Sequence, residues 1–383
     1  MSEFQGILDQ LLKDKRLMQP FTATPSSSYR DSLDENLKEY VRKIRNLSPT
    51  GALTDWLKDN ANQIEIINSK LIESIDQYLS GSAGKAYDKI ENLMELALVK
   101  RSLMSLKKPL SKYQHDRRES KSLFRVRESE EHLSERDGIF HIPFDKRNFV
   151  KTQRYSIAGL PCLYLGSSLY VCWQEMGKPS LNKLFLSHFK LNHEYGEVNV
   201  LNFAFSLEAL KLQRLESFLD SHNINDIEAK AYLAIWPILL ACSYNVEHPY
   251  SSFSIEYVVP NLILQWIGRE KCALSGIMYL STKTKQLRNN DIGINFVFPP
   301  ATDMVKHKGF CPKLNQIFKW SKPISWQLLN TINHNGGADN NTFNIQISDD
   351  LENQIIQNYR ATKFYKMENK LRDFTKLNNI EIA

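Results

Sequence analysis

Hydrophobic residues in the first third of the chain follow the spacing of amphipathic helices. Between residues 53 and 75 they recur three and four positions apart, which places them along one side of a helix. A break is predicted over residues 78–84 (YLSGSAG), followed by a second helix through YDKIENLMELALVKRSLMSL that stops at Pro109. We therefore expect residues 1–115 to form an α-helical region, either a bundle or an extended arm.

The pattern then changes from helix-like to strand-like. Residues 107–121 (KKPLSKYQHDRRESK) are polar and basic without periodicity, and we expect a solvated linker there. The short apolar runs beyond it are rich in aromatic and β-branched residues and are bounded by Gly, Pro, Asn and Ser, which is typical of strands. These runs are LFRVR, PCLYLG, SLYVCWQEM, LFLSHFKL, VNVLNF, GIMYLS and INFVFP.

Helical patterns interrupt these strands over about residues 206–220 and 226–243. A further polar helix is expected in the tail, after a loop that begins at residue 334. Strands and helices mixed without a regular βαβ rhythm predict an α+β domain over residues 116–383.

Composition and charge exclude several classes of protein. The chain has 383 residues, of which 42% are hydrophobic and 24% charged, so it is neither a disordered nor a fibrous chain. The net charge of +6 is not gathered in a basic stripe, and we expect no direct contact with nucleic acid. The most apolar run, residues 231–242 (AYLAIWPILLAC), is too short to span a bilayer and contains Pro237. It is predicted to be a buried helix, with no membrane attachment.

Cysteines and histidines indicate neither disulfides nor a metal. The five Cys residues form no C-x-x-C pair, and the nine His residues show no zinc-ligand spacing, so no metal is expected. The N-terminal stretch MSEFQGILDQ lacks the layout of a signal peptide. We therefore expect reduced thiols and a cytoplasmic protein.

Two short motifs fail on inspection. GSAGK at residues 81–85 lacks the first glycine and the final hydroxyl of a phosphate-binding loop, so it is interpreted as a helix break. Arg127 and His132, and also Arg136 and His141, match the R-x-x-x-x-H pattern of some helical ribonucleases. The sequence around His141 predicts a turn and a strand instead of a helix, so a ribonuclease is the last of the alternatives.

The informative stretch is residues 147–175 (RNFVKTQRYSIAGLPCLYLGSSLYVCWQE). Arg154 precedes a turn, Tyr164 lies in a short predicted strand, and Glu175 follows an apolar aromatic segment eleven residues later. Taken alone, Glu175 is either a helix-start residue or a partly buried acid, and Tyr164 is either a core or a binding residue.

The order of these residues resembles the RES-domain family, which is named for its Arg, Glu and Ser. The resemblance begins at LFRVR with Arg125, continues through QRYSIAGLPCLYLGSSLYVCWQE, and ends at GIMYLSTK with Ser281 and INFVFP with Asn295. It covers roughly residues 120–300. The family's G-R-[FW]-N turn is present here as QRYS at residues 153–156, so its glycine and asparagine are missing.

The resemblance implies an ADP-ribosyltransferase-like fold and NAD as the substrate. Residues 116–383 would form the RES domain with a C-terminal helical extension, preceded by the helical residues 1–115. Members of the family degrade NAD by phosphorolysis, with inorganic phosphate as co-substrate, or by hydrolysis, or they transfer ADP-ribose to a protein. Many are toxins neutralised by an antitoxin with an Xre-type DNA-binding domain. The added helical region is expected to act as a sensor, an inhibitor or a surface for homo-oligomerisation.

The resemblance also implies a role for each residue. Cleavage of the nicotinamide–ribose bond passes through an oxocarbenium-like state, which the Glu175 carboxylate can stabilise. Arg125 and Arg154 suit the NAD pyrophosphate, because a guanidinium offers a planar fork of donors. Tyr164 can stack on nicotinamide, and Ser281 can bond a phosphate or ribose hydroxyl.

Alternatives remain for the residues and for the function. Arg127 can replace Arg125 as the functional arginine, and Ser281 can be a strand-end cap. Protein ADP-ribosylation is the first alternative to NAD degradation. The second alternative is a non-catalytic binding module whose functional part is the helical region. The altered turn at residues 153–156 supports this alternative.

Overall fold

The computed structural model describes residues 3–18, 21–23, 28–111, 115–116, 119–120, 122–204, 207, 226–248, 251–269, 273–283, 291–301, 306–331, 359–374 and 377–378. The helix expected over residues 206–220 and most of the expected polar tail lie outside these residues.

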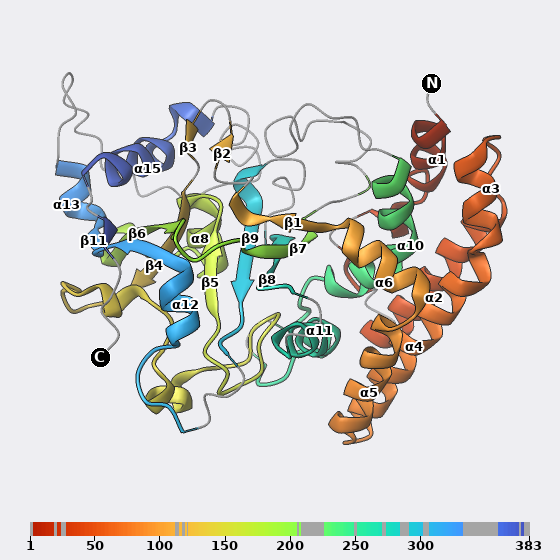
Figure 1. Ribbon diagram of the computed structural model, residues 1–383, viewed down its shortest axis with the longest axis horizontal. Coiled ribbons are helices and arrows are strands. Elements are labelled where there is room, and N and C mark those ends of the chain that lie inside the picture. The colour runs from red at the N-terminus through yellow and green to blue at the C-terminus, as the bar shows by residue number, and fades with distance from the viewer. Residues whose placement is uncertain are drawn as a thin grey trace.

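The helices predicted in the first third of the chain are present (Figure 1). They are α1 (Glu3–Leu11), α2 (Tyr29–Arg45), α3 (Ala52–Asp59), α4 (Ala61–Leu79), α5 (Ala83–Met94) and α6 (Ala97–Ser105). The break expected at residues 78–84 separates α4 from α5. The single helix expected after it is two helices, because the chain leaves helical geometry between α5 and α6.

One mixed sheet of ten strands organises the rest of the described chain, in the order β1-β7-β8-β9-β5-β4-β6-β10-β12, with β11 also paired to β6. The strands are β1 (Lys107–Pro109), β4 (Leu123–Glu128), β5 (Leu163–Gly166), β6 (Leu184–Leu191), β7 (Asn199–Phe203), β8 (Gly276–Leu280), β9 (Ile294–Phe298), β10 (Phe318–Ser321), β11 (Ile324–Ser325) and β12 (Leu377–Asn378). β7 and β8 are parallel, and the other pairs described in this sheet are antiparallel. The α+β class is therefore confirmed.

Two local predictions were wrong. Lys107–Pro109 is not linker but the edge strand β1, which pairs with β7, while β2 (His115–Asp116) and β3 (Glu119–Ser120) pair with each other. The run SLYVCWQEM is not a strand but the helix α8 (Leu169–Glu175). Ser168 caps this helix by accepting a hydrogen bond from the Val171 N–H at 3.0 Å, which favours a helical start over a strand.

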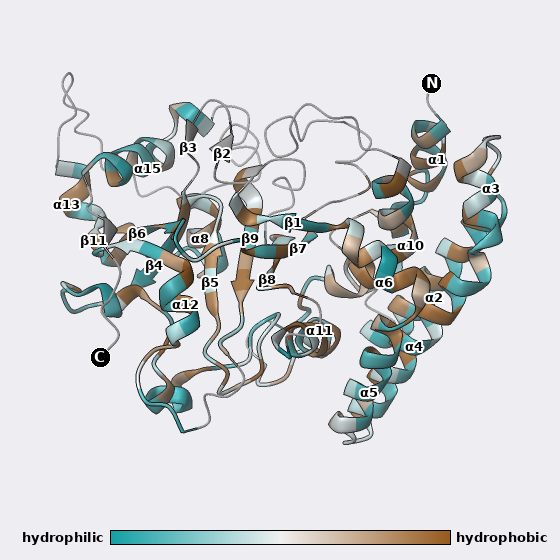
Figure 2. Ribbon diagram, viewed as in Figure 1, coloured by the Kyte–Doolittle hydropathy of each residue, from teal (hydrophilic) through white to brown (hydrophobic). Residues whose placement is uncertain are grey.

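The remaining helices pack around the sheet. They are α10 (Asp226–Cys242), α11 (Val258–Gly268), α12 (Pro312–Ile317), α13 (Trp326–Thr331) and α15 (Lys363–Phe374), with short 3₁₀ turns that include η2 (Arg136–Ile139) and η5 (Ile255–Tyr257). In Figure 1, α10 and α11 lie between the sheet and the helices α2 to α5, while α6 leads directly into β1. One continuous hydrophobic core joins α1–α6, α10, α11 and one face of the sheet. In Figure 2 the brown, hydrophobic colouring follows α10, α11 and the central strands.

The apolar run 231–242 is the buried helix that its composition predicts. The carbonyl that Pro237 leaves without its helical donor accepts a hydrogen bond from a neighbouring helix. A proline removes the N–H that would bond the carbonyl four residues earlier, here Leu233. The Tyr40 hydroxyl of α2 donates to that Leu233 carbonyl at 2.6 Å. Nearby, the Tyr29 hydroxyl donates to the Ala241 carbonyl at 3.0 Å, so α2 is bonded to both the middle and the end of α10.

No helix in the described part of the chain is long and apolar enough to cross a bilayer.

Candidate active site

The candidate site forms where α8 meets the central strands. Gly166 at the end of β5 allows a close approach: a Cβ there would lie 2.5 Å from Cys172 Sγ and 2.7 Å from Val171 Cγ1 of α8. At the first residue of α8, the Leu169 N–H donates to the buried Glu368 carboxylate of α15 at 2.8 Å. These two contacts fix the helix whose last residue is Glu175.

Three neighbouring strands present the predicted residues on one face. Across β5, β9 and β8, Gly166 pairs with Asn295, and Asn295 pairs with Tyr279. Because side chains alternate along a strand, Tyr164 shares a face with Gly166, and Ser281 shares one with Tyr279. This face carries Tyr164, Asn295, Tyr279 and Ser281 together, and α8 packs on it at Gly166.

Glu175 is bonded directly to two of these side chains. Its Oε1 accepts a hydrogen bond from Ser281 Oγ at 2.7 Å and another from Asn295 Nδ2 at 2.6 Å. Lys283 Nζ donates to the Glu175 main-chain carbonyl at 2.5 Å and lies 4.0 Å from Oε2. The Glu175 side chain is 33% exposed. One carboxylate oxygen is thus fixed by the sheet, while Oε2 accepts no hydrogen bond from the described residues.

Arg154 lies beside this carboxylate group without bonding to it. The Nη1 atom donates to the Cys242 carbonyl at the end of α10, at 3.1 Å, and Nη2 donates to Thr282 Oγ1 at 2.7 Å. The guanidinium carbon lies 5.1 Å from the centre of the Tyr257 ring. Arg154 is only 8% exposed, and its partner Thr282 directly follows Ser281 in the chain, so the guanidinium is held in a fixed position close to Ser281.

Tyr164 belongs to the same face, whereas Arg125 does not. The Tyr164 hydroxyl donates to Ser156 Oγ at 2.9 Å, which ties the strand to the loop of Arg154. Arg125 alternates along β4 with Phe124 and Val126, which pack in the cluster around α8 and α15.

The Arg125 Nη1 atom donates to the main-chain carbonyl of Tyr164 at 2.7 Å, and burial lowers the pKa of Arg125 to about 10. Its Nε atom is buried and finds no hydrogen-bond partner in the described part of the chain. The alternative arginine, Arg127, is exposed and donates to the Gly138 carbonyl. Neither arginine joins the group around Glu175.

Two tyrosines outside the predicted set, Tyr279 and Tyr257, complete the surroundings of Glu175 and Arg154. Burial raises the pKa of Tyr279 well above its usual range, and the nearby negative charge of Glu175 adds to that rise. Burial also raises the pKa of Tyr257, while the positive charge of Arg154 opposes the rise. Tyr279 could have been found from its spacing two residues before Ser281 in the strand; Tyr257 gave no such signal.

His141, the residue of the ribonuclease alternative, is fully buried. Its Nδ1 lies 2.8 Å from the Ile142 carbonyl oxygen, and its Nε2 accepts the Cys311 N–H at 2.8 Å. Burial lowers its pKa to about 4, so the ring is neutral at physiological pH. This arrangement leaves an RNA substrate no access to the ring. Among the described residues, no group of His, Cys, Asp and Glu side chains could hold a metal ion.

The fold and site define an α+β protein whose candidate active site is centred on one carboxylate. The chain is 31% identical over 311 residues to a protein of Bacillus subtilis (strain 168) named "Putative toxin YopC", a match that covers 78% of this chain. It spans 66% of that relative, slightly less than two thirds of its length. No family model and no solved structure matches the chain.

Proposed function

We propose that this protein is a toxin that consumes NAD by cleaving the bond between nicotinamide and ribose. The observation that carries the proposal is the Glu175 carboxylate, held through Oε1 by Ser281 and Asn295 and open at Oε2. A preorganised carboxylate of this kind stabilises positive charge that develops on a sugar ring. The similarity to a protein named as a toxin supports the biological class.

In the proposed reaction, the bond between the ribose carbon and the nicotinamide nitrogen breaks, and its electron pair leaves with nicotinamide. The cationic ring of NAD becomes neutral nicotinamide, so no general acid is required. Phosphate or water then forms a new carbon–oxygen bond at the same ribose carbon, and water releases a proton in doing so. The negative Oε2 side of Glu175 would face the positive ribose during the exchange.

The neighbouring groups suit the rest of the substrate. Arg154 carries a fixed positive charge for the pyrophosphate, and Tyr164, tied by its hydroxyl to the loop of Arg154, is the aromatic residue that would stack on nicotinamide. Lys283, 4.0 Å from Oε2, brings positive charge to the open side of the carboxylate, where an attacking phosphate would need it. Arg125 would act indirectly, by supporting the strand of Tyr164.

The proposed partner is an antitoxin, which would keep the toxin inactive in the cytoplasm until it is needed. A toxin that consumes NAD must be restrained in the cell that makes it. Expression of the chain alone is therefore expected to arrest growth and to lower cellular NAD.

The test is NAD turnover by the purified chain with and without inorganic phosphate, followed by NMR identification of the products. ADP-ribose 1″-phosphate would identify phosphorolysis, free ADP-ribose hydrolysis, and a labelled protein band ADP-ribosyl transfer. Glu175→Gln keeps the size of the side chain but removes its charge, and it should reduce nicotinamide release by at least about a hundredfold. The exposed Glu131→Gln is the matched control. Full turnover by folded Glu175→Gln would refute the assignment.

A further inference from the structure

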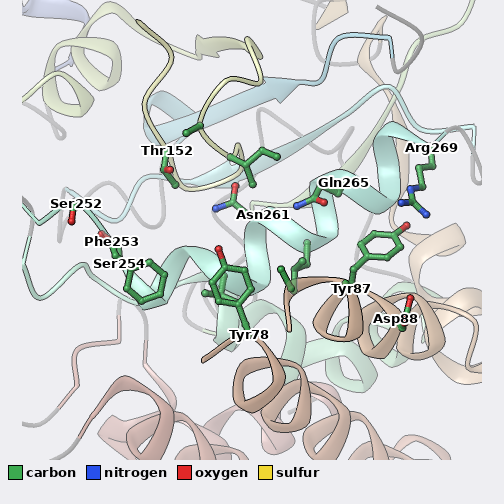
Figure 3. Close-up of a pocket in the computed structure, with 16 residues that line it drawn as sticks. Tyr78, Tyr87, Asp88, Thr152, Ser252, Phe253, Ser254, Asn261, Gln265 and Arg269 are labelled. Carbon is green, nitrogen blue, oxygen red and sulfur yellow. The ribbon is translucent and has the colours of Figure 1, made fainter. Parts of the chain in front are cut away.

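A cavity separate from the Glu175 group lies between the helical region and the sheet region. Its volume is about 600 Å³, within the range of small-molecule sites. Its walls come from the last turn of α4, from α5 and α11, and from the loops at residues 152–158 and 252–254 (Figure 3). None of Glu175, Ser281, Arg154 or Tyr164 lines it.

One side of the cavity is a row of polar side chains on α11. Asn261, Gln265 and Arg269 are four residues apart, so they share a face of the helix, and Figure 3 shows the three side chains in a row along α11, with Arg269 beside Tyr87 of α5. The rest of α11 is almost entirely apolar and buried. Asn261 is 7% exposed, and its buried Oδ1 has no hydrogen-bond partner among the residues that the structure describes. An unpaired buried amide oxygen is costly, and a donor from a ligand would satisfy it.

The opposite side of the cavity is aromatic. The rings of Tyr78 and Phe253 are nearly parallel, at 7°, with centres 6.1 Å apart. Phe253 and Ile157 are 49% and 40% exposed, which leaves apolar surface at the rim. Flat aromatic walls facing amide side chains suit a planar heterocycle with polar edges, because the rings stack and the amides pair with the edge.

Arg269 adds a positive charge at one end of the row. Its guanidinium carbon lies 4.2 Å from the centre of the Tyr87 ring, and within the described residues it pairs with no carboxylate. Eight residues of helix separate Asn261 from Arg269, a distance of about 12 Å along the axis. A ligand that fills the row therefore carries a heterocycle at one end and an anionic group at the other.

We propose that this cavity is a binding site for a nucleoside monophosphate, distinct from the site that would take NAD. The base lies against the aromatic wall and pairs with Asn261 and Gln265, and the phosphate meets Arg269. Thr152, Ile157 and Ala158 line the cavity and belong to the same loop as Arg154, so a bound nucleotide contacts the loop that serves the candidate active site.

The experiment is calorimetric titration of the full chain with AMP, adenosine and ribose 5-phosphate. AMP should bind, and Asn261→Leu should weaken it about tenfold, as expected for the loss of one buried hydrogen bond. Arg269→Ala should abolish the preference for AMP over adenosine. Both variants should remain folded by thermal unfolding, since Asn261→Leu removes an unsatisfied group and Arg269 is exposed.

AMP is also a fragment of NAD, so Glu175→Gln and Ser281→Ala serve as the contrasting variants. They should leave AMP binding unchanged. The proposal is overturned if millimolar AMP does not bind, if Asn261→Leu and Arg269→Ala bind it normally, or if the Glu175 and Ser281 variants lose it. The calorimetric signal of AMP binding does not depend on NAD turnover. A protein that binds AMP but does not cleave NAD would therefore contradict the proposed enzyme function and leave this proposal standing.

Discussion

Gly166→Ala tests whether the contact between β5 and α8 sets the position of Glu175. The added Cβ would lie 2.5 Å from Cys172 Sγ and 2.7 Å from Val171 Cγ1, where ordinary contacts begin at about 3.4 Å. The helix must therefore move by about 1 Å or its side chains must turn away. Overpacking of this kind typically costs about 1–3 kcal/mol in the free energy of unfolding.

The effect on the site should exceed the effect on stability. Glu175 lies at the end of the displaced helix, and its bonds to Ser281 and Asn295 are 2.7 and 2.6 Å long. A shift of about 1 Å takes both beyond hydrogen-bonding distance. Misplacement on that scale can cost about a hundredfold in rate, so nicotinamide release should fall by roughly that factor while the variant stays folded.

Chemical denaturation and nicotinamide release by NMR measure the two effects side by side. Gly138→Ala is the matched control, because its added Cβ would make only an ordinary 3.5 Å contact with Leu133. Adding Cys172→Ala to Gly166→Ala removes the nearest obstructing atom and should restore part of the stability and part of the nicotinamide release. A Gly166→Ala protein with the stability and turnover of the natural chain would refute the packing argument.

Three further predictions concern stability. Glu368→Leu should lower the free energy of unfolding by about 1–3 kcal/mol in denaturation, because the Leu169 N–H loses its charged partner. Burial lowers the pKa of His141 to about 4 and of His188 to about 3. As the pH falls, these histidines are therefore protonated in the unfolded chain before they are protonated in the folded chain. Stability should be full above pH 6.5 and fall as the pH drops toward 4, by up to about 3 kcal/mol from His141 alone; a flat denaturation profile would contradict this. Residues 116–383 expressed alone should fail to unfold cooperatively on heating, because their core is shared with the N-terminal helices; a sharp transition would contradict the shared core.

Local sequence patterns predict two kinds of element correctly: helices with one solvated side, and strands that are apolar along their whole length. The N-terminal helices have clear apolar stripes, and the strands that contain Tyr164 and Ser281 have dense aromatic and β-branched composition. Residues 169–175 were mistaken for a strand because α8 is short and apolar on nearly every side, so periodicity could not separate the two states. Lys107–Pro109 is a strand only through its pairing with β7, which no local pattern shows.

The candidate site was predictable to the extent that its residues lie at the ends of recognisable strands. Glu175, Ser281 and Asn295 were named from their order in the chain, and the structure brings these three together by hydrogen bonds. Arg125 was expected nearby, but its face depends on strand register, which its own segment does not fix. Tyr257 reaches Arg154 through a tertiary contact, which could not be inferred from a single sequence.

The helical region reaches the candidate site through the end of α10. Tyr29 of α2 bonds the Ala241 carbonyl, and Arg154 bonds the next carbonyl, that of Cys242. A movement of α2 relative to the sheet would therefore move the acceptor that holds the Arg154 guanidinium. The nucleotide cavity adds a second route, since its walls combine α5 with the loop of Arg154. An arm that only tethered the domain would need neither contact, so the helical region is better understood as part of the structure that positions Arg154.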